Sequence, residues 1–597
     1  MKTHNNGELR ITHVNEEVRL VGWVAKKRNL GSMAFIDLRD RYGKTQLVFD
    51  ETFHDQVHDV RSEYVISVLG KVVERQSKNP DMLTGDIEIV VEKLEVINTA
   101  KTTPLIIDNE TDALEAVRMK YRYLDLRRPN MQANLIQRSK IASVIRRFLD
   151  EQDFVDIETP VLGKSTPEGA RDYLVPSRNY PGEFYALPQS PQIYKQLLMI
   201  SGFERYYQIA KCFRDEDLRA DRQMEFTQVD IETSFLSDRQ IQAMTEEMMQ
   251  KVFKEVLDRD ITAPFKRMTW SEAMHTYGTD KPDTRFGLEF HDLGEVFANT
   301  DFKVLQSGLG EGKVIKAIVV PNYASITRKG IDKVLDIVKA HGGHGVLDMK
   351  FVEGKLDGRI LKFFSEAEIA NLESQLNLVE NDLVLAVSGD FEVSCTALGA
   401  IRSYLANELE LIDHDAYNFL WVTEFPLLEY DAEEDRYFAR HHPFTRAMDE
   451  DKDLIDTEPG KVRAIAYDMI LNGYELGGGS LRIYNNEDQT KMFEVLGFTH
   501  EEIRNQFGFF IDAFEYGTPP HGGIAFGLDR LAMLIAKENS IREVIAFPKN
   551  AQAKDPMMDA PSKASDAQLA ELYLSVVKAK EENNWYNFCK QVLFGIM

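Results

Sequence analysis

The chain has 597 residues, enough for about three to five domains, and its 43% hydrophobic and 28% charged residues are ordinary for a globular protein. The formal net charge of −26 excludes nonspecific binding of nucleic acid over the whole surface, so any RNA contact requires a local basic patch. No apolar run approaches the roughly 18 residues that span a bilayer, and the first residues lack the features of a signal or transit peptide. The three cysteines are too widely spaced for a zinc site, so we expect a cytoplasmic protein with neither zinc nor a membrane partner.

Residues 1–105 contain about five short runs of strand-forming residues that are separated by turns. This pattern predicts a small barrel of the oligonucleotide-binding (OB) type. The basic stretch between Arg19 and Lys44 gives the barrel a face suited to RNA. Phe35 lies within this stretch and either stands on the open face, where it stacks a base, or fills the core.

Residues 106–130 are basic and polar, and they predict a hinge between two patterned regions. A helix is expected from Met131, and the strand that follows it ends at Pro160. Residues 163–172 are rich in turn formers and predict a surface loop. These elements belong to a second patterned region, which we expect to extend from residue 131 to residue 285.

A second helix is expected to begin after Ser190, which is a good N-cap and is followed by proline at the first helical position. Gln192 and Lys195 are three residues apart and share one face of its first turn. A cation at this place opposes the helix dipole. Lys195 is therefore either a simple exposed lysine or a ligand for an anionic group.

A long hairpin is predicted by Tyr206–Phe213 and the run from Glu225, which flank a highly charged connector. Side chains alternate along a strand, so Gln228, Asp230 and Glu232 point to one face of the second run. That face is either solvated or the floor of a polar cleft.

Strand and helix patterns alternate between residues 286 and 415, which predicts a separate α/β module inserted into the chain. The earlier pattern resumes at residue 416 and continues to about residue 555. His441 and His442 lie in this last region and are either ordinary surface groups or part of a site. No neighbouring residues supply the further ligands that a metal would need.

The Asn472-Gly473 pair is the strongest short-range signal for a hairpin. A two-residue turn pairs Asp468 with Gly477 and puts Asp468 and Glu475 on one face as diagonal neighbours. Two carboxylates so placed repel each other unless a cation lies between them. Hard oxygen ligands of this kind suit Mg²⁺ that bridges nucleotide phosphates.

Arg482 lies seven residues beyond Glu475 and would face the opposite way on a regular strand. We therefore predict a β-bulge within Gly477–Gly479, which returns Arg482 to the face of the carboxylates. Farther along, an apolar helix is expected, and Arg530 is the single cation in it and lies near its start. This residue is either a snorkelling surface arginine or a ligand for an anion.

Several of these segments carry short motifs in a fixed order. Phe213-Arg214-Asp215-Glu216 with Arg222-Gln223 resembles the second signature motif of the class II aminoacyl-tRNA synthetases, and Gly527-Leu528-Asp529-Arg530 resembles the third. The strings STPEGARDYLVPSR and HHPF are similar to segments of the aspartate-specific, bacterial-type branch of that family. The resemblance covers essentially the full length of the chain.

The resemblance implies a multidomain α+β protein. Its parts are an OB-type anticodon-binding barrel over residues 1–105, a hinge over 106–130, an antiparallel-sheet catalytic domain over 131–285 and 416–555, an inserted α/β domain of GAD type over 286–415, and an extension over 556–597. The implied activity is that of an ATP-dependent, AMP-forming ligase, which makes aspartyl adenylate and passes aspartate to the 3′ end of tRNA(Asp). The family also implies a homodimer and Mg²⁺ bound with ATP.

The resemblance also implies roles for individual residues. Candidate aspartate ligands are Glu168, Gln192, Lys195, Arg214, Asp230, His441 (ahead of His442) and Arg482. Candidate ATP ligands are Arg214, Asp215, Glu216, Gln223, Glu475, Gly527, Leu528, Asp529 and Arg530, of which Arg214 and Arg530 are the candidate catalytic residues. Candidate Mg²⁺ ligands are Asp468 and Glu475, and candidate anticodon contacts are Arg28, Leu30, Phe35, Gln46 and Met82.

Three alternatives to this function concern the tRNA that is charged, the amino acid that is used, and whether the protein is an enzyme at all. Leu30 and Met82 resemble the strict form of the enzyme, whereas a relaxed form would also charge tRNA(Asn). Asparaginyl and lysyl enzymes share the barrel and the sheet, but three features favour aspartate: the inserted module, the loop at STPEGARDYLVPSR, and the cations Lys195 and Arg482. A catalytically silent RNA-binding regulator on the same scaffold is the alternative from another functional class, and it would form no adenylate.

Overall fold

The structure, a computed structural model, describes residues 2–166, 169–306 and 309–577. The chain divides into two compact units. The first comprises Met1–Val144, Leu218–Gln223 and Asp529–Pro561, and the second comprises Ile145–Asp217, Met224–Leu528 and Ser562–Met597. Within the described residues, no helix is both long and apolar enough to cross a membrane.

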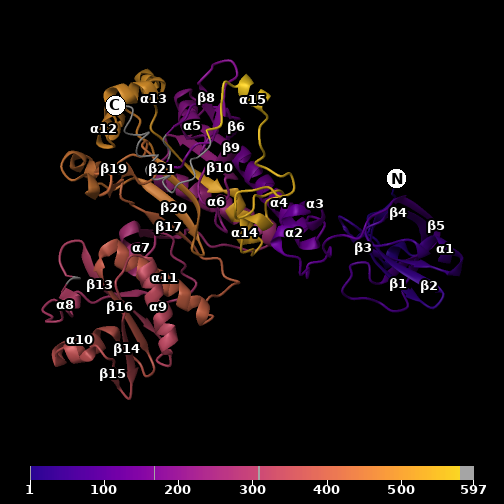
Figure 1. The fold of residues 1–597 in the computed structure, drawn as a ribbon, viewed down its shortest axis with the longest axis horizontal. Coiled ribbons are helices and arrows are strands. Elements are labelled where there is room, and N and C mark those ends of the chain that lie inside the picture. The colour runs from indigo at the N-terminus through magenta and orange to yellow at the C-terminus, as the bar shows by residue number, and fades with distance from the viewer. Residues whose placement is uncertain (1, 167–168, 307–308, 578–597) are drawn as a thin grey trace. The chain divides into compact units, whose positions relative to one another are not determined.

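The first unit contains a closed barrel, which is drawn in indigo in Figure 1. In sheet order its strands are β1 (Glu17–Leu30), β2 (Met33–Asp40), β3 (Gly43–Phe49), β5 (Ile87–Asn98) and β4 (Val65–Glu74), and the short helix α1 (His54–His58) follows β3. Only β3 and β5 pair in parallel. Alternate residues such as Val18, Leu20 and Ile36 fill the interior. The predicted OB-type barrel is confirmed.

The segment predicted as a basic, polar hinge contains short helices and buried charge. The helices α2 (Glu115–Lys120) and α3 (Arg122–Asp125) precede α4 (Pro129–Glu151), which begins two residues before the predicted start at Met131. Proline suits the first turn of a helix, where its missing N–H has no partner to lose. Arg122, Asp125 and Arg128 are all buried.

The second unit is built on an eight-stranded sheet (Figure 1), which confirms the antiparallel-sheet fold predicted for the catalytic domain. In sheet order the strands are β11 (Lys266–Thr269), β17 (Phe419–Thr423), β20 (Ala466–Leu471), β21 (Tyr474–Leu481), β22 (His521–Gly527), β10 (Glu225–Ser234), β9 (Arg205–Phe213) and β6 (Val155–Asp156). The two edge pairs, β11 with β17 and β6 with β9, are parallel. All other neighbouring strands in this sheet are antiparallel.

Helices and two small hairpins complete this part of the chain. The helices are α5 (Gln192–Ile200), α6 (Asp238–Leu257), α7 (Trp270–Tyr277), α12 (Asn486–Val495), α13 (His500–Ala513) and α15 (Asp566–Glu571). Helix α14 (Leu528–Ile535) belongs to the first unit from Asp529 onward. The hairpins pair β7 (Leu174–Pro176) with β8 (Phe184–Ala186), and β18 (Leu428–Asp431) with β19 (Arg436–Ala439). The hairpin predicted around residues 206–232 is formed by β9 and β10.

The predicted insertion forms a sheet with helices on both faces. In sheet order its strands are β12 (Phe290–Asp292), β13 (Lys313–Val320), β16 (Leu383–Asp390), β14 (Leu347–Val352) and β15 (Lys355–Asp357), and all neighbours are antiparallel. The helices are α8 (Lys303–Gln306), α9 (Arg328–Ala340), α10 (Glu366–Leu376) and α11 (Phe391–Glu408). Leu385 packs with α9 and α11, whereas its neighbours Val384 and Ala386 pack with α8 and α10. Strand β16 is therefore apolar on both sides.

The hairpin of β20 and β21 carries the expected bulge, one residue before the predicted range. Ile470 pairs with Glu475, but Met469 pairs with Gly477, so Leu476 is the extra residue. Asp468 consequently pairs with Gly478 and not with Gly477, which corrects the predicted register. The extra residue changes the phase of the strand, so that Glu475, Gly478 and Arg482 lie on the same face.

Candidate active site

Strand β10 supplies two fully buried carboxylates from one face. Asp230 pairs with Ala525 and Glu232 pairs with Gly523 of the adjacent strand β22. Gly523 has no side chain to block this face, since a Cβ there would lie 2.1 Å from Glu232 Oε2. The carboxylate of Glu232 can therefore reach across β22 toward the strand beyond it.

Two buried cations meet these carboxylates. Arg482 donates from Nε to Glu232 Oε1 at 2.9 Å and from Nη2 to Glu232 Oε2 at 3.0 Å, a bidentate pair. Lys195, in the first turn of α5, lies 3.1 Å from Asp230 Oδ1 and 3.5 Å from Glu232 Oε2. Lys195 and Arg482 are each about 2% exposed at the side chain, so Lys195 is not a simple exposed lysine.

The two carboxyl groups differ in their acidity. Burial would raise the pKa of Glu232, but Arg482 and Lys195 outweigh it and hold the pKa below its ordinary value. Burial dominates at Asp230 and raises its pKa despite the contact with Lys195. Asp230 Oδ2 and the buried side-chain nitrogen of Gln192 have no hydrogen-bond partner in the structure. Asp230 and Gln192 therefore retain capacity for a ligand that brings its own polar groups.

The structure brings together three of the residues predicted to bind the amino acid, namely Lys195, Asp230 and Arg482, and Gln192 lies in the same first turn of α5 as Lys195. It adds Glu232, which the sequence analysis placed on the polar face of its strand but did not select as a site residue. The signal that could have found it is the alternation that puts Glu232 beside Asp230. Glu168 was also predicted, and it lies outside the residues that the structure describes.

The two histidines reach different parts of this site. His442 Nε2 lies 2.7 Å from Nη1 of Arg482, and His442 Nδ1 accepts a hydrogen bond from the Phe444 backbone N–H at 3.2 Å. His441 Nε2 lies 3.8 Å from Asp468 Oδ1. Burial lowers the pKa of His441 to about 4, and burial together with the charge of Arg482 lowers the pKa of His442 well below its ordinary value. Both rings are therefore neutral at physiological pH.

These depressed values predict that the folded protein loses stability in acid. An unfolded histidine binds a proton below pH of about 6.5, whereas the folded rings resist protonation, so the free energy of unfolding falls as the pH drops from about 7 toward 4. We expect a loss of about 1–3 kcal/mol from His441 over this window, and a loss of the same sign from His442. Thermal melting at pH 7.5 and pH 5 measures the effect, and His442→Asn should make the difference between the two melting temperatures smaller. His500→Asn is the matched control because His500 is highly exposed. An identical decline in wild type and His442→Asn would contradict the prediction.

Asp468 and Glu475 project from the bulged hairpin on one face, as predicted. A Cβ on Gly478 would lie 2.7 Å from Asp468 Oδ1 and 3.4 Å from Glu475 Oε1, so this glycine leaves a small space beside both carboxylates. Burial, followed by the charges of Glu475 and Asp280, raises the pKa of Asp468 well above its ordinary value. Asp468 Oδ1 is buried without a hydrogen bond, and Lys281 Nζ lies 3.2 Å from Glu475 Oε2. The pair has the donor set and the space for one small hard cation.

The end of β9 positions the candidate catalytic arginine. The guanidinium carbon of Arg214 lies 5.1 Å from the ring centroid of Phe226, and its buried Nε has no hydrogen-bond partner. The Arg214 backbone N–H donates to Met224 O at 2.9 Å, which closes the base of the connector. Asp215 is exposed and Glu216 is half-buried in the connector that follows. The ring of Phe226 thus contacts the guanidinium of Arg214, and the buried Nε remains available to a ligand.

The remaining candidate nucleotide ligands lie at or near the start of α14 and in the connector Leu218–Gln223. In the first unit, Arg530 Nη2 lies 3.1 Å from Asp221 Oδ2, and Asp529 accepts a hydrogen bond from Arg138 at 2.5 Å. Gln223 exchanges two hydrogen bonds with the backbone of Lys549, at 3.1 Å from its side-chain nitrogen and 2.8 Å to its side-chain oxygen. Both polar atoms of Gln223 therefore contact the protein. In the second unit, Gly527 ends β22 and Leu528 is buried.

The predicted anticodon contacts of the barrel share one surface. Arg28 pairs with Phe35 across β1 and β2, and it donates to Asp37 at 2.7 Å and to Gln46 at 3.1 Å. Phe35 is half-buried and lies outside the apolar core cluster of the barrel, which favours the open face over the interior. Of the two further candidates, Leu30 is the last residue of β1 and is 69% exposed, and Met82 is half-buried in the loop between β4 and β5.

Comparisons with known proteins agree with the motifs. A profile of tRNA synthetases class II (D, K and N) matches residues 114–551, and a profile of the OB-fold nucleic acid binding domain matches residues 18–97. The chain is 54% identical over 588 residues to an aspartate–tRNA(Asp/Asn) ligase of Bacillus cereus, which covers 97% of this chain and 99% of the relative. It is 52% identical over 576 residues to an aspartate–tRNA ligase of Exiguobacterium sibiricum, which covers 96% of this chain and 98% of the relative.

Solved structures share the fold. The asparaginyl-tRNA synthetase of Pyrococcus horikoshii complexed with asparaginyl-adenylate matches with a TM-score of 0.58 and 18% identity, over 91% of this chain and 97% of that one. An aspartyl tRNA synthetase of Entamoeba histolytica matches with a TM-score of 0.56 and 18% identity, over 92% and 91%. At this level of identity the likeness establishes the architecture alone.

Proposed function

The chain belongs to the class II tRNA synthetases of the D, K and N group, and we propose how its side chains activate aspartate. Its relatives over nearly the full length are aspartate–tRNA ligases, so the reaction is the ATP-dependent joining of aspartate to tRNA. The single observation that carries the substrate assignment is the buried cluster of Lys195 and Arg482 with Asp230 and Glu232.

Recognition of aspartate requires cations for its side-chain carboxylate and acceptors for its ammonium group. Arg482 and Lys195 supply the cations, and Asp230 Oδ2, which has no partner in the structure, supplies an acceptor, with Gln192 beside it. An asparagine side chain would leave the paired cations uncompensated in a buried site. That penalty exceeds the loss of a methylene contact and explains the choice of the acid over the amide.

The chemical step consists mainly of positioning and charge neutralisation. The α-carboxylate of aspartate attacks the α-phosphorus of ATP, a phosphorus–oxygen bond forms to give the adenylate, and the bond to pyrophosphate breaks. Arg214 holds oxygens of both reacting groups with its planar fork, which packs against Phe226 and has a buried Nε without a hydrogen bond. Arg530 binds the γ-phosphate, and Glu216 and Gln223 position the nucleotide. In the second step the terminal 3′ hydroxyl of the tRNA attacks the adenylate carbonyl, and AMP leaves.

Asp468 and Glu475 are the residues that would hold Mg²⁺. The space beside Gly478 and the buried Asp468 oxygen without a hydrogen bond support this assignment. When bound with ATP, the ion neutralises phosphate charge and makes pyrophosphate a better leaving group. Two carboxylates are a donor set that would suit Mg²⁺ carried by a nucleotide.

Replacing Gly478 by alanine should impair this metal site without unfolding the protein. The new Cβ would lie 2.7 Å from Asp468 Oδ1 and would displace that carboxylate. We expect the rate of aspartate-dependent ATP–pyrophosphate exchange to fall about 100-fold, and the Mg²⁺ concentration that gives the half-maximal rate to rise. Gly508→Ala is the control, because the nearest atom to its Cβ is a flexible arginine carbon at 3.4 Å. An unchanged Mg²⁺ requirement would remove Gly478 from the metal site.

The proposal also covers which tRNAs the enzyme charges and its oligomeric state. The barrel binds the anticodon through Arg28, Phe35 and Gln46, and Leu30 and Met82 make the enzyme strict for tRNA(Asp). The relaxed form is the second candidate, since the Bacillus cereus relative is named for both tRNA(Asp) and tRNA(Asn). The enzyme acts as a homodimer in the cytoplasm, as its family implies.

The test is ATP–pyrophosphate exchange with aspartate, asparagine, glutamate or lysine and without tRNA. Exchange with aspartate alone is expected, and no exchange with any of the four would overturn the enzyme assignment. Charging of purified tRNA(Asp) and tRNA(Asn) then separates the strict from the relaxed form. Charging of both would assign the relaxed form.

A further inference from the structure

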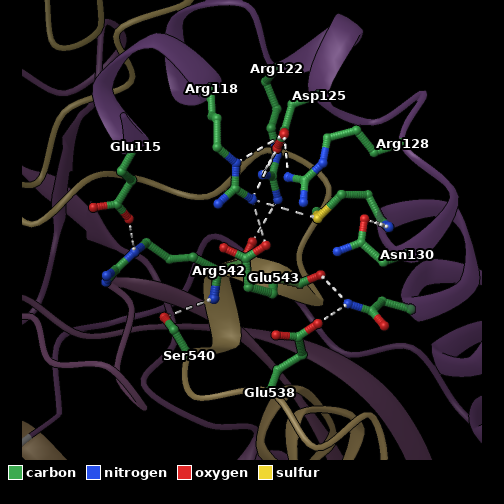
Figure 2. A network of polar contacts seen from close by, with 12 residues as sticks. Glu115, Arg118, Arg122, Asp125, Arg128, Asn130, Glu538, Ser540, Arg542 and Glu543 are labelled. Carbon is green, nitrogen blue, oxygen red and sulfur yellow. Dashed lines mark hydrogen bonds and ion pairs between the residues drawn. The ribbon is translucent and has the colours of Figure 1, made fainter. Parts of the chain in front are cut away.

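A polar network in the first unit joins the segment before α4 to the chain that follows α14. Figure 2 shows the guanidinium groups of Arg118, Arg122 and Arg128 converging on Asp125. The distances to the Asp125 oxygens are 2.9, 2.6 and 2.8 Å, respectively. One buried carboxylate cannot balance three arginines, and Arg118 pairs in addition with Glu543 at 2.6 Å. From the sequence, these residues were predicted only to form part of a polar hinge.

Arg122 differs from the other two arginines in what it holds. Its remaining donors contact three backbone carbonyls of one short segment: Arg542 O at 2.5 Å, Ile545 O at 2.9 Å and Ala546 O at 2.9 Å. The side chain is 3% exposed, so these bonds are sheltered from water. A side chain with this many fixed donors determines the path of the segment that accepts them.

The segment held by Arg122 lies between two residues whose backbones form hydrogen bonds with the connector Leu218–Gln223. Before it, the Ile541 backbone N–H donates to Ala220 O at 2.9 Å. After it, Lys549 exchanges the two hydrogen bonds with Gln223. The connector is the part of the β9–β10 hairpin that follows Arg214 and Glu216, and its Asp221 pairs with Arg530.

We propose that Arg122 is a positioning residue for ATP, which acts by fixing residues 542–546 so that Ile541 and Lys549 hold the nucleotide-binding connector in place. The inference rests on the proposed function, because it assigns nucleotide contacts to Gln223 and Arg530. Arg122 touches no substrate. Its effect passes through the backbone from one buried guanidinium to the connector, and a displacement of about 1 Å there is enough to weaken binding of the nucleotide.

Arg128 provides a matched control within the same network. It is also buried and donates to Asp125, but its other donors contact Asp108 O at 2.9 Å and Asn109 O at 3.3 Å, away from residues 542–546. Arg122→Lys and Arg128→Lys each keep a positive charge near Asp125 and lose the fork. Both variants should therefore lose similar thermal stability, whereas only Arg122→Lys loses the support of the connector.

The experiment is steady-state ATP–pyrophosphate exchange with wild type and both variants, together with melting temperatures and equilibrium binding of ATP. For Arg122→Lys we expect the KM and the dissociation constant for ATP to rise about tenfold, with the KM for aspartate within twofold of wild type. Arg128→Lys should leave the affinity for ATP unchanged. Equal affinities for ATP in all three proteins, or equal losses in both variants, would overturn the proposal in favour of a purely structural role.

A double-mutant cycle tests the route of the effect. If Arg122 acts through Gln223, Arg122→Lys should weaken ATP binding much less in a Gln223→Ala background than in wild type. Fully additive losses would reject that route. Absence of exchange in the wild type would instead reject the proposed function, so the two failures are distinguishable.

Discussion

Arg482→Leu is expected to abolish aspartate-dependent exchange, with a fall of about 10³-fold or more in kcat/KM for aspartate. The leucine removes one of the two cations that receive the substrate carboxylate and leaves the buried Glu232 without its bidentate partner. Binding of ATP, measured at equilibrium, should change less than fivefold because Arg482 has no assigned contact with the nucleotide. Equal losses of affinity for aspartate and ATP would count against this assignment.

The variant also costs stability, and a second substitution separates the two effects. Removing one partner of a buried ion pair destabilises a protein by about 3–5 kcal/mol, so the melting temperature should fall. Adding Glu232→Gln removes the uncompensated charge and should recover much of that stability without restoring use of aspartate. Arg446→Leu is a control for loss of an arginine, since Arg446 pairs with the exposed Asp449. Recovery of exchange in the double variant would show that Arg482 acts only by neutralising Glu232.

Arg214→Ala is expected to lower the rate of adenylate formation about 10³-fold while leaving the melting temperature within a few degrees of wild type. The guanidinium stacks over Phe226 and its buried Nε makes no hydrogen bond, so the fold loses little when it is removed. Single-turnover formation of adenylate at saturating aspartate and ATP measures the chemical step directly. Arg214→Lys should recover part of the rate, because it keeps the charge but not the fork.

The control for this prediction is Arg219→Ala, which removes an exposed arginine from the connector Leu218–Gln223 that follows Arg214 in the chain. Its rate should match wild type. A rate for Arg214→Ala within tenfold of wild type would exclude Arg214 from stabilising the transition state, and an equal loss in both variants would indicate general disturbance of the connector.

Features that depend on residues close together in the chain were predictable from the sequence. Alternation along β10 placed Asp230 on the polar face, and the helix signals around Ser190 placed Lys195 in the first turn of α5. The hairpin turn at Asn472-Gly473 was also found from local chemistry. Each of these depends on residues that are close together in the chain.

Features that depend on contacts across strands were not predictable in the same way. The sequence required a bulge before Arg482 but could not place it at Leu476, because any residue between Glu475 and Arg482 restores the phase equally well. Glu232 was not selected, since its importance comes from a guanidinium 250 residues away. Arg122 was predicted only as part of a basic, polar hinge, because nothing in its own segment reveals the carbonyls that it contacts.

The extra residue in β21 also constrains how this hairpin can change in evolution. Because Leu476 sets which side chains face the site, removing one residue between Glu475 and Arg482 would send Arg482 to the opposite face, and adding one would do the same. Insertions or deletions of two residues would preserve the parity of the strand while moving Arg482 along it. Single-residue length changes in this stretch should therefore be selected against even where every remaining side chain is tolerated at its position.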